Sequence, residues 1–476
     1  MDKELLDKVK RGIDAGRPSE DIKADLTSQG FMEDEVMEAL HDLRGFERSS
    51  EEKRDIRLFT FKEVFDRVGY GFSSVQFVNI LFYSIGANYF LIGIINGLKA
   101  ILSILFSSFL QEYANLRQVS TKFLSKAGVL FGFSFIFIAM AITMRSIPLF
   151  SAAILIGAIG VVSYGDLYEQ LTERHLKKEK LGKFLLNISH FGVIITGLAM
   201  ILSGILFDRF PIVGAERIVL FGKSMPVFGY LICFEITAIA FILSGYVLHF
   251  VKENIPSQEK LKGFISGHLK KIKEQNKVFF KNKSLVFLLI ASSITGLVQI
   301  LGNSFYGVYI YRKFQEGLFE GIFSGIFLNL AFIFLFAIVV SFIGPAFSRY
   351  LNKRVGLAPS LVFGSLLTAI MPLVAVYNPK FMPLLIANAL AVLGAGILGM
   401  GQGLLVRKLL RDDERSLYYA VLSIGVLVPF LILIPLGSWL AQISLMLLFQ
   451  VLGGVILFLA APIYFVLVVL ANKQRL

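Results

Sequence analysis

The sequence predicts an all-α polytopic membrane protein, with twelve transmembrane helices in two pseudo-symmetric six-helix bundles and a small N-terminal three-helix domain. Three observations predict this fold. The chain of 476 residues is 55% hydrophobic and only 17% charged, with a mean hydropathy of +0.71, whereas a soluble domain carries about 25% charged residues. Its apolar stretches are about 20 residues long, enough to cross ~30 Å of hydrocarbon. Its motifs recur in the same order in both halves.

Residues 1–43 predict three short helices. Gly16 and Gly30 stand at helix-ending positions, and Pro18 opens the second helix. The spacing of GRPSEDIKADLTSQGF followed by MEDEVMEALHDL resembles the small UBA-like modules appended to many prokaryotic proteins. Such a module implies a possible cytoplasmic protein partner. Residues 44–69 read as a charged linker. The first 67 residues hold 13 Lys/Arg against 18 Asp/Glu, so an acidic soluble piece precedes a basic membrane piece.

The membrane region predicts a first bundle over residues 70–250 and a second over residues 284–471. The first span is the least apolar, because it carries two serines and two amides. The twelve spans expected from hydropathy are 70–88, 90–110, 123–144, 147–167, 184–207, 226–250, 284–311, 317–343, 357–377, 381–406, 417–440 and 444–471.

The distribution of basic residues predicts the orientation. One alternating set of loops, together with the C-terminal tail, contains 25 Lys/Arg and the other set contains 7. Since the basic side faces the cytoplasm, both termini are expected on the cytoplasmic side of the cell membrane. The central loop, 251–283, contains nine lysines beside an apolar helical stripe that starts at Leu261. It is expected to lie on the anionic inner leaflet or to act as a soluble linker helix, and the two readings are compatible.

An internal repeat joins the two bundles. At an offset of 233 residues, Arg174 matches Arg407 and Gly192 matches Gly425, and nearby offsets match Gln76 with Gln299 and Tyr83 with Tyr306. Matches in one order with slowly drifting offsets indicate a duplicated six-helix unit.

Two such units joined by a basic loop resemble the major facilitator superfamily across residues 70–471. The family signature between its second and third spans is degenerate in both copies, SFLQEYANLR and GPAFSRYLNK. The resemblance implies gating roles for the loop charges. The alternative is that they only set the topology. The expected gating or coupling residues, including two carboxylates at the end of span 4, are Glu112, Arg117, Asp166, Glu169, Gly344, Arg349 and Lys353.

Two polar stripes predict a substrate cavity. Gln76, Asn79 and Tyr83 share one face of span 1, and Gln299, Asn303 and Tyr306 share one face of span 7. Polar groups near the middle of a membrane helix usually face a cavity or a neighbouring helix. The alternative interpretation is hydrogen bonding between helices without a ligand.

Lys99 and Gln402 complete the predicted substrate site. Lys99 lies near the middle of span 2, where an ammonium needs a counter-ion, a carbonyl cage or an anionic ligand. Its acidic candidates are few, and one of them, Glu235, lies in span 6. Gln402 lies in the glycine-rich span 10, where small residues permit either close packing or hinging.

These features predict a secondary transporter that moves a small-molecule substrate by alternating access. A receptor or scaffold that uses the N-terminal module as its working part is the alternative. An enzyme is not expected. The only stretch that approaches a catalytic cluster is GDLYEQLTERH, and its spacing matches no catalytic arrangement. One cysteine and five scattered histidines predict no metal site and no cofactor. The basic charge sits in short loops, so no nucleic-acid partner is expected.

Overall fold

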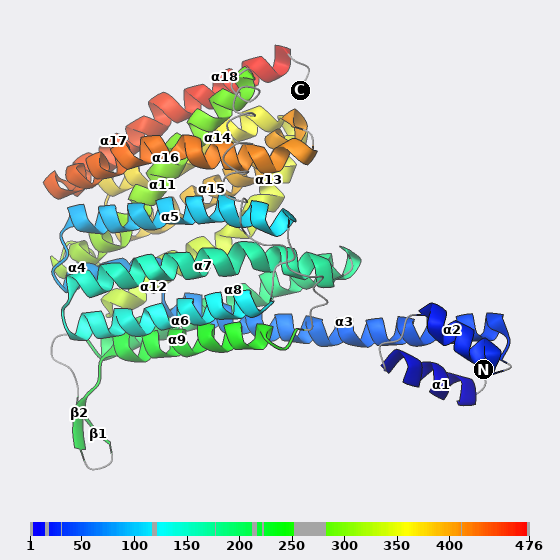
Figure 1. Ribbon diagram of the computed structural model, residues 1–476. Coiled ribbons are helices and arrows are strands. Elements are labelled where there is room, and N and C mark those ends of the chain that lie inside the picture. Colours follow the sequence, from blue (N-terminus) through cyan, green and yellow to red (C-terminus); the bar gives the residue numbers. More distant parts are fainter. Residues whose placement is uncertain are drawn as a thin grey trace.

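The computed structural model describes residues 3–14, 19–29, 31–116, 121–176, 178–211, 217–220, 223–251, 282–410 and 412–473. In these ranges the chain is almost entirely helical, as the composition predicts (Figure 1). The exception is an antiparallel hairpin of two strands, β1 (Arg217–Leu220) and β2 (Lys223–Pro226). The central loop expected on the inner leaflet lies outside the described residues, apart from its ends.

Three helices pack together at the N-terminal end of the chain. They are α1 (Lys3–Asp14), α2 (Ser19–Ser28) and the first turns of α3 (Glu33–Phe72). Their buried apolar side chains form one core that is separate from the rest of the protein: Leu5, Val9, Ile22, Leu26, Val36 and Ala39. We call this unit the module. The kinship with UBA-like proteins stays a prediction.

The expected linker over residues 44–69 is instead the middle of α3, which runs for 40 residues without a break. The sequence contains no proline there, and most of its residues favour helices. From residue 52 onward one face of the helix is buried, at spacings of three and four residues: Glu52, Asp55, Phe59, Lys62 and Asp66. Because this buried stripe is mostly charged, a hydropathy pattern does not reveal it.

Two helical bundles make up the rest of the protein. The first contains the end of α3, α4 (Val75–Ser84), α5 (Tyr89–Leu116), α6 (Thr121–Thr143), α7 (Ile147–His175), α8 (Lys178–Arg209) and α9 (Gly229–Leu248). The second contains α11 (Lys283–Gln315), α12 (Ile326–Ser341), α13 (Ile343–Arg354), α14 (Leu357–Tyr377), α15 (Phe381–Leu409), α16 (Asp412–Ile443), α17 (Leu445–Val455) and α18 (Ala461–Lys473), with a short π-helical segment, Ile456–Ala460, before α18.

The packing inside the first bundle recurs in the second. Helix α6 packs on α7 and α9, and its counterpart α14 packs on α15 and on α17–α18. Likewise α5 packs on α7, while α12 and α13 pack on α15. The duplicated order of motifs in the sequence therefore corresponds to a duplicated arrangement of helices.

Ten helices in the described ranges are long and apolar enough to cross a membrane, or eleven if the bent pair α12–α13 is one span. The expected span 70–88 is not one helix, because α3 ends at Phe72 and α4 starts at Val75. The Ser73 hydroxyl donates to the Gly69 carbonyl at 2.7 Å beside this break. The expected span 317–343 starts only at Ile326. A total of twelve spans stays a prediction.

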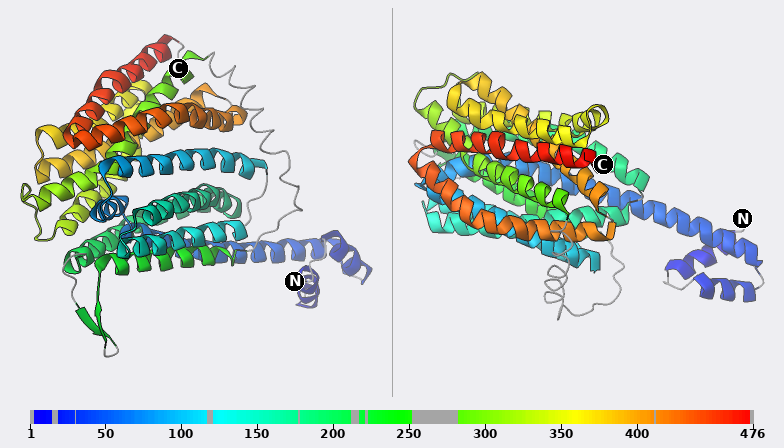
Figure 2. Two further views of the ribbon diagram at one scale, coloured as in Figure 1. Left: turned by 60° about the vertical axis from the view of Figure 1, so that its left-hand side comes forward. Right: turned by 90° about the horizontal axis from the view of Figure 1, so that it is seen from above.

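The bundles have two distinct ends. The hairpin end carries β1 and β2, and the module end is the one from which α3 extends toward α1 and α2 (Figure 1). The helices of the two bundles converge at the hairpin end and diverge toward the module end (Figure 2). The basic loops predict that the module end is cytoplasmic.

The two bundles meet along two seams, α5 against α16 and α8 against α12, and also where α4 and α5 pack on α11. Glycines line both seams. A Cβ atom added to Gly93 or Gly97 would collide with the α16 side chains of Ser438 or Ile434. On the other seam, a Cβ atom on Gly204 would lie 3.0 Å from the Cα atom of Leu328. Small residues let membrane helices approach closely where no hydrophobic effect drives association.

Ion pairs fasten α3 to the first bundle near the module end. Lys180 Nζ lies 2.6 Å from Glu52 Oε2, and His175 Nδ1 lies 3.0 Å from Asp55 Oδ2. Burial alone would raise the pKa of Asp55, but its hydrogen bonds to His175 and Arg54 and their charges outweigh burial and lower it. Both α7 and α8 thereby hold the helix that carries the module.

The α8–α12 seam gives a test of the packing. Replacing Gly204 with valine should destabilise the protein by about 1–3 kcal/mol, because the added atoms overpack a backbone contact. The matched control is Gly165→Val, since a Cβ atom there meets nothing within 4 Å. Thermal unfolding of the purified variants measures the difference. Equal melting temperatures for the two variants would contradict the close seam.

The Asp55–His175 pair predicts a pH-dependent stability. Because the folded state lowers the pKa of Asp55 below 3.8, its contribution is present above that pH and is lost as the pH falls through the folded pKa. Asp55→Asn should therefore cost about 1–3 kcal/mol at pH 7. The melting temperatures of variant and natural protein should converge toward pH 3. A pH-independent gap would mean that the carboxylate charge is not the stabilising feature.

Candidate functional site

The two predicted amides of the first span lie where α4 crosses α11. Gln76 Oε1 accepts a hydrogen bond from the backbone N–H of Gly307 at 3.0 Å. The Asn79 side-chain amide donates to the backbone carbonyls of Asn303 and Ser304, both at 3.3 Å. Both amides are buried. They therefore join the first bundle to the second, as the alternative interpretation of the polar stripe proposed.

Tyr83 belongs to a second group of contacts at the hairpin end. Its ring stacks on that of Tyr89, with centroids 5.5 Å apart. The Arg312 guanidinium donates to the Tyr89 hydroxyl at 2.6 Å and pairs with Glu316 at 2.8 Å. Tyr89 is the first residue of α5 and Arg312 lies in the last turn of α11, so this contact also bridges the two bundles.

A carboxylate bridges the bundles at the same end. Asp208, near the end of α8, accepts hydrogen bonds from the N–H groups of Phe327 and Leu328 at 2.9 and 2.8 Å. It thereby supplies the N-terminal cap of α12, which belongs to the other bundle. The bonds of Gln76, Arg312 and Asp208 together fasten the bundles at the hairpin end.

The predicted stripe on α11 changes its exposure along the helix. Tyr306 is buried, Asn303 is exposed and Gln299 is half-buried. The residues one and two turns toward the module end on this face, Gly296 and Ser292, are also accessible. The exposed part of this polar face therefore lies on the module-end side of the buried Tyr306. Polar groups at such positions usually face a cavity or a neighbouring helix.

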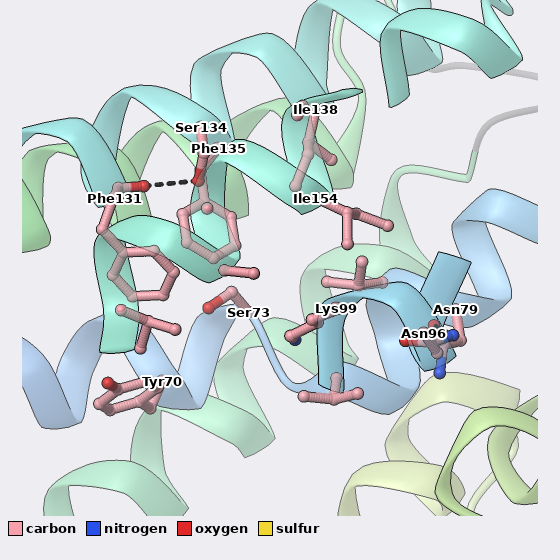
Figure 3. Close-up of a pocket in the computed structure, with 16 residues that line it drawn as sticks. Tyr70, Ser73, Asn79, Asn96, Lys99, Phe131, Ser134, Phe135, Ile138 and Ile154 are labelled. Atoms are coloured by element: carbon pink, nitrogen blue, oxygen red, sulfur yellow. Dashed lines mark hydrogen bonds between the residues drawn. The ribbon is translucent and has the colours of Figure 1, made fainter. Parts of the chain in front are cut away.

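A cavity of about 110 Å³ lies inside the first bundle, between α3–α4, α5, α6 and α7 (Figure 3). Lys99 and Asn96 of α5 line it together with Asn79. The Asn96 amide donates to Asn79 Oδ1 at 3.0 Å, so the cavity adjoins the amides that join the bundles. The hydroxyls of Ser73 and Ser134 also line it, and the remaining wall is aromatic and aliphatic.

Lys99 has no hydrogen bond or ion pair within the described part of the chain, and it lines this cavity (Figure 3). Glu235, the acid that the sequence offered as a partner, has an exposed side chain on α9. An unpaired ammonium inside a membrane bundle is costly, so Lys99 is a candidate for a functional residue.

The glycine-rich helix α15, which carries Gln402, is closely packed at some positions and open at others. Gln402 donates to the hydroxyl of Tyr464 on α18 at 2.6 Å, so the substrate-binding residue expected here bonds within the second bundle. A Cβ atom on Gly394 would lie 2.6 Å from the Gly364 carbonyl, whereas one on Gly399 or Gly403 would meet nothing within 4 Å. Close packing therefore occurs at Gly394, and hinging stays a prediction.

The expected gating residues are spread along the module end. Gly344 faces Gly396 of α15, and a Cβ atom on it would lie 3.5 Å from the Gly396 Cα atom. Arg349 and Lys353 are exposed on α13. Glu112 lies on α5, and Asp166 and Glu169 lie on α7, but their side chains are outside the described part, as is Arg117 altogether. Their gating roles stay predictions.

A buried ionic cluster escaped the sequence analysis. Lys62 Nζ lies 2.7 Å from Asp66 Oδ2, and the Tyr164 and Ser244 hydroxyls donate to Asp66 Oδ1 at 3.1 and 2.5 Å. The Lys62 ammonium also lies 3.2 Å from the ring centroid of Tyr168. The cluster binds α3, α7 and α9 to one another. The i, i+4 spacing of Lys62 and Asp66 within an aromatic segment was its available signal.

Solved transporters share this fold. The chain is similar to a variant of the nucleoside transporter NupG, with a TM-score of 0.67 and 13% identity over 87% of this chain and 99% of that one. It is similar to a bacterial homologue of the iron transporter ferroportin in an inward-facing state, with a TM-score of 0.64, 15% identity and coverages of 87% and 98%. A bacterial homologue of the human lysosomal transporter Spinster, inward-facing and unoccupied, gives a TM-score of 0.57, 14% identity and coverages of 88% and 96%.

The sequence itself matches no protein-family model and no curated protein. The structural likeness establishes a multi-pass, transporter-like helical fold. At these identities the fold is all that the likeness establishes.

The exposure gradient on α11 predicts chemical reactivity. In a Cys233→Ala background, Asn303→Cys should react with a water-soluble maleimide, because Asn303 is exposed. Tyr306→Cys should react at least tenfold more slowly, because Tyr306 is buried one turn away. Labelling rates of the purified protein, read by mass spectrometry, measure the difference. Equal rates would contradict a cavity that ends between the two positions.

Proposed function

We propose that this chain is a secondary transporter of the major facilitator type, which moves a small organic solute by alternating access. The observation that carries the proposal is an asymmetry between the two ends. Side-chain bonds join the bundles at the hairpin end, whereas the accessible polar face of α11 leads toward the module end. Such an arrangement represents one state of a protein whose two halves rock around a central site.

The seams supply the moving surface. Helices α5 and α8 present glycines to α16 and α12, so the backbones approach closely where one bundle would move on the other. The bonds at the hairpin end are polar and individually weak, about 0.6 kcal/mol each in a membrane protein. Opening the hairpin end therefore requires the loss of only a small set of weak bonds.

The orientation and the module belong to the same proposal. The excess of basic residues favours a cytoplasmic module end, so the described state opens to the cytoplasm of a cell-membrane protein. The module is then an accessory domain that contacts a cytoplasmic protein. The basic central loop contacts anionic lipids of the inner leaflet.

A receptor or scaffold on a transporter-like frame is the second candidate. The continuity of α3 favours it, because a single helix connects the module core to the ionic cluster of the first bundle. Such a helix can transmit a change in the bundle to a partner of the module. Removing residues 3–29 distinguishes the two, since a transporter keeps its alternating accessibility without α1 and α2.

Sided labelling tests alternating access without knowledge of the substrate. In sealed vesicles, Asn303→Cys should react with a membrane-impermeant maleimide from the module side only. Adding Arg312→Gln and Asp208→Ala removes three hydrogen bonds between the bundles and should raise labelling from the hairpin side severalfold.

Lys313→Gln is the matched control. It removes a neighbouring charge whose acidic partner, Glu316, lies on the same bundle at 3.4 Å. Unchanged sidedness in the double variant would mean that the bundles do not rock, and the scaffold would then be the better account.

A further inference from the structure

The Lys99 cavity has the properties of a ligand site. This cavity brings an ammonium, amide groups and hydroxyls together with an aromatic wall. Lys99 is the only charged residue among its lining residues. One positive charge without an acid matches one negative charge on a ligand.

Apart from the Tyr70 hydroxyl, the neutral polar groups of the wall offer few free donors to an anion. The Ser73 hydroxyl donates to the Gly69 carbonyl at 2.7 Å, and the Ser134 hydroxyl donates to the Phe131 carbonyl at 2.6 Å. The Asn96 amide donates to Asn79 and to the Ile92 carbonyl at 2.9 Å. A doubly charged phosphate, which takes several donors, is therefore poorly served, whereas a single carboxylate is well served by the ammonium.

The remaining wall is apolar. Phe131, Phe135, Ile138 and Ile154 line it (Figure 3). The cavity volume of about 110 Å³ is of the order of a cavity that holds one benzene ring. An apolar pocket of this size suits one ring or a short branched chain.

We propose that the Lys99 cavity binds a small amphiphilic monocarboxylate, with its carboxylate on the ammonium and its apolar body against Phe131 and Phe135. This inference rests on the proposed transport function and specifies the substrate class. The site lies beside Asn79, which bonds the two bundles, so an occupant can influence their separation. Neutral solutes of the same shape lack the charge that the site requires.

Thermal shift and calorimetric titration of the purified full-length protein test the proposal, with benzoate as probe and benzamide as its neutral counterpart. Benzoate should raise the melting temperature and benzamide should not. Lys99→Gln should weaken benzoate binding at least tenfold, and Lys99→Arg should retain most of it. The matched control is Lys122→Gln, which removes an exposed lysine and should bind benzoate like the natural protein.

A second variant addresses the apolar wall. Phe135→Ala should weaken benzoate binding while it leaves the weaker binding of acetate unchanged, because acetate does not reach the ring. This comparison remains informative if Lys99→Gln fails to fold.

The outcomes separate this inference from the proposed function. Benzamide binding as well as benzoate, or benzoate binding that survives in Lys99→Gln, would overturn the monocarboxylate site. Sided labelling that still alternates would then leave the transporter proposal standing. Charge-dependent benzoate binding in a protein without alternating accessibility would support the site and contradict transport.

Discussion

Close contact between helices in a medium without water is the constraint on which this structure depends. Lipid does not drive helices together, so the two bundles associate through packing and polar bonds. Glycines provide the packing at the seams, and Gln76, Asp208 and Arg312 provide the bonds at one end. The proposed rocking of the bundles requires these close seams and this small set of bonds to yield.

Hydropathy predicted most of the membrane helices because crossing hydrocarbon imposes a length and a composition on each segment separately. It failed at the first helix, where the buried face of α3 is charged. The stripe from Glu52 to Asp66 is buried only because His175, Lys180 and Tyr164 approach it from other helices. That burial is a tertiary property, and a sequence window does not contain it. The start of α12 was misplaced for the same reason, since Asp208 of α8 helps to fix it.

The candidate site shows the same division. The sequence identified Gln76, Asn79, Gln299 and Lys99 because polar groups in apolar spans are conspicuous. It did not distinguish amides that join the bundles from groups that face open space, since both have the same period along a helix. Only the neighbours decide. Asn79 meets α11, whereas Lys99 meets a cavity and no acid within the described ranges.

The two helices of the broken first span, α3 and α4, are bonded to different bundles. On the N-terminal side of the break at Ser73, α3 is bound to α7 and α9 through Asp66. On the same side, Ser203 of α8 donates to the Phe72 carbonyl at 3.3 Å. On the C-terminal side of the break, α4 is bound to α11 through the amides of Gln76 and Asn79. A rocking motion must therefore either release those amides or flex the break. Since α3 is fastened to the first bundle on the N-terminal side of the break, its helical extension and the module it carries belong mechanically to that bundle. The proposed rocking would then displace the module relative to the second bundle.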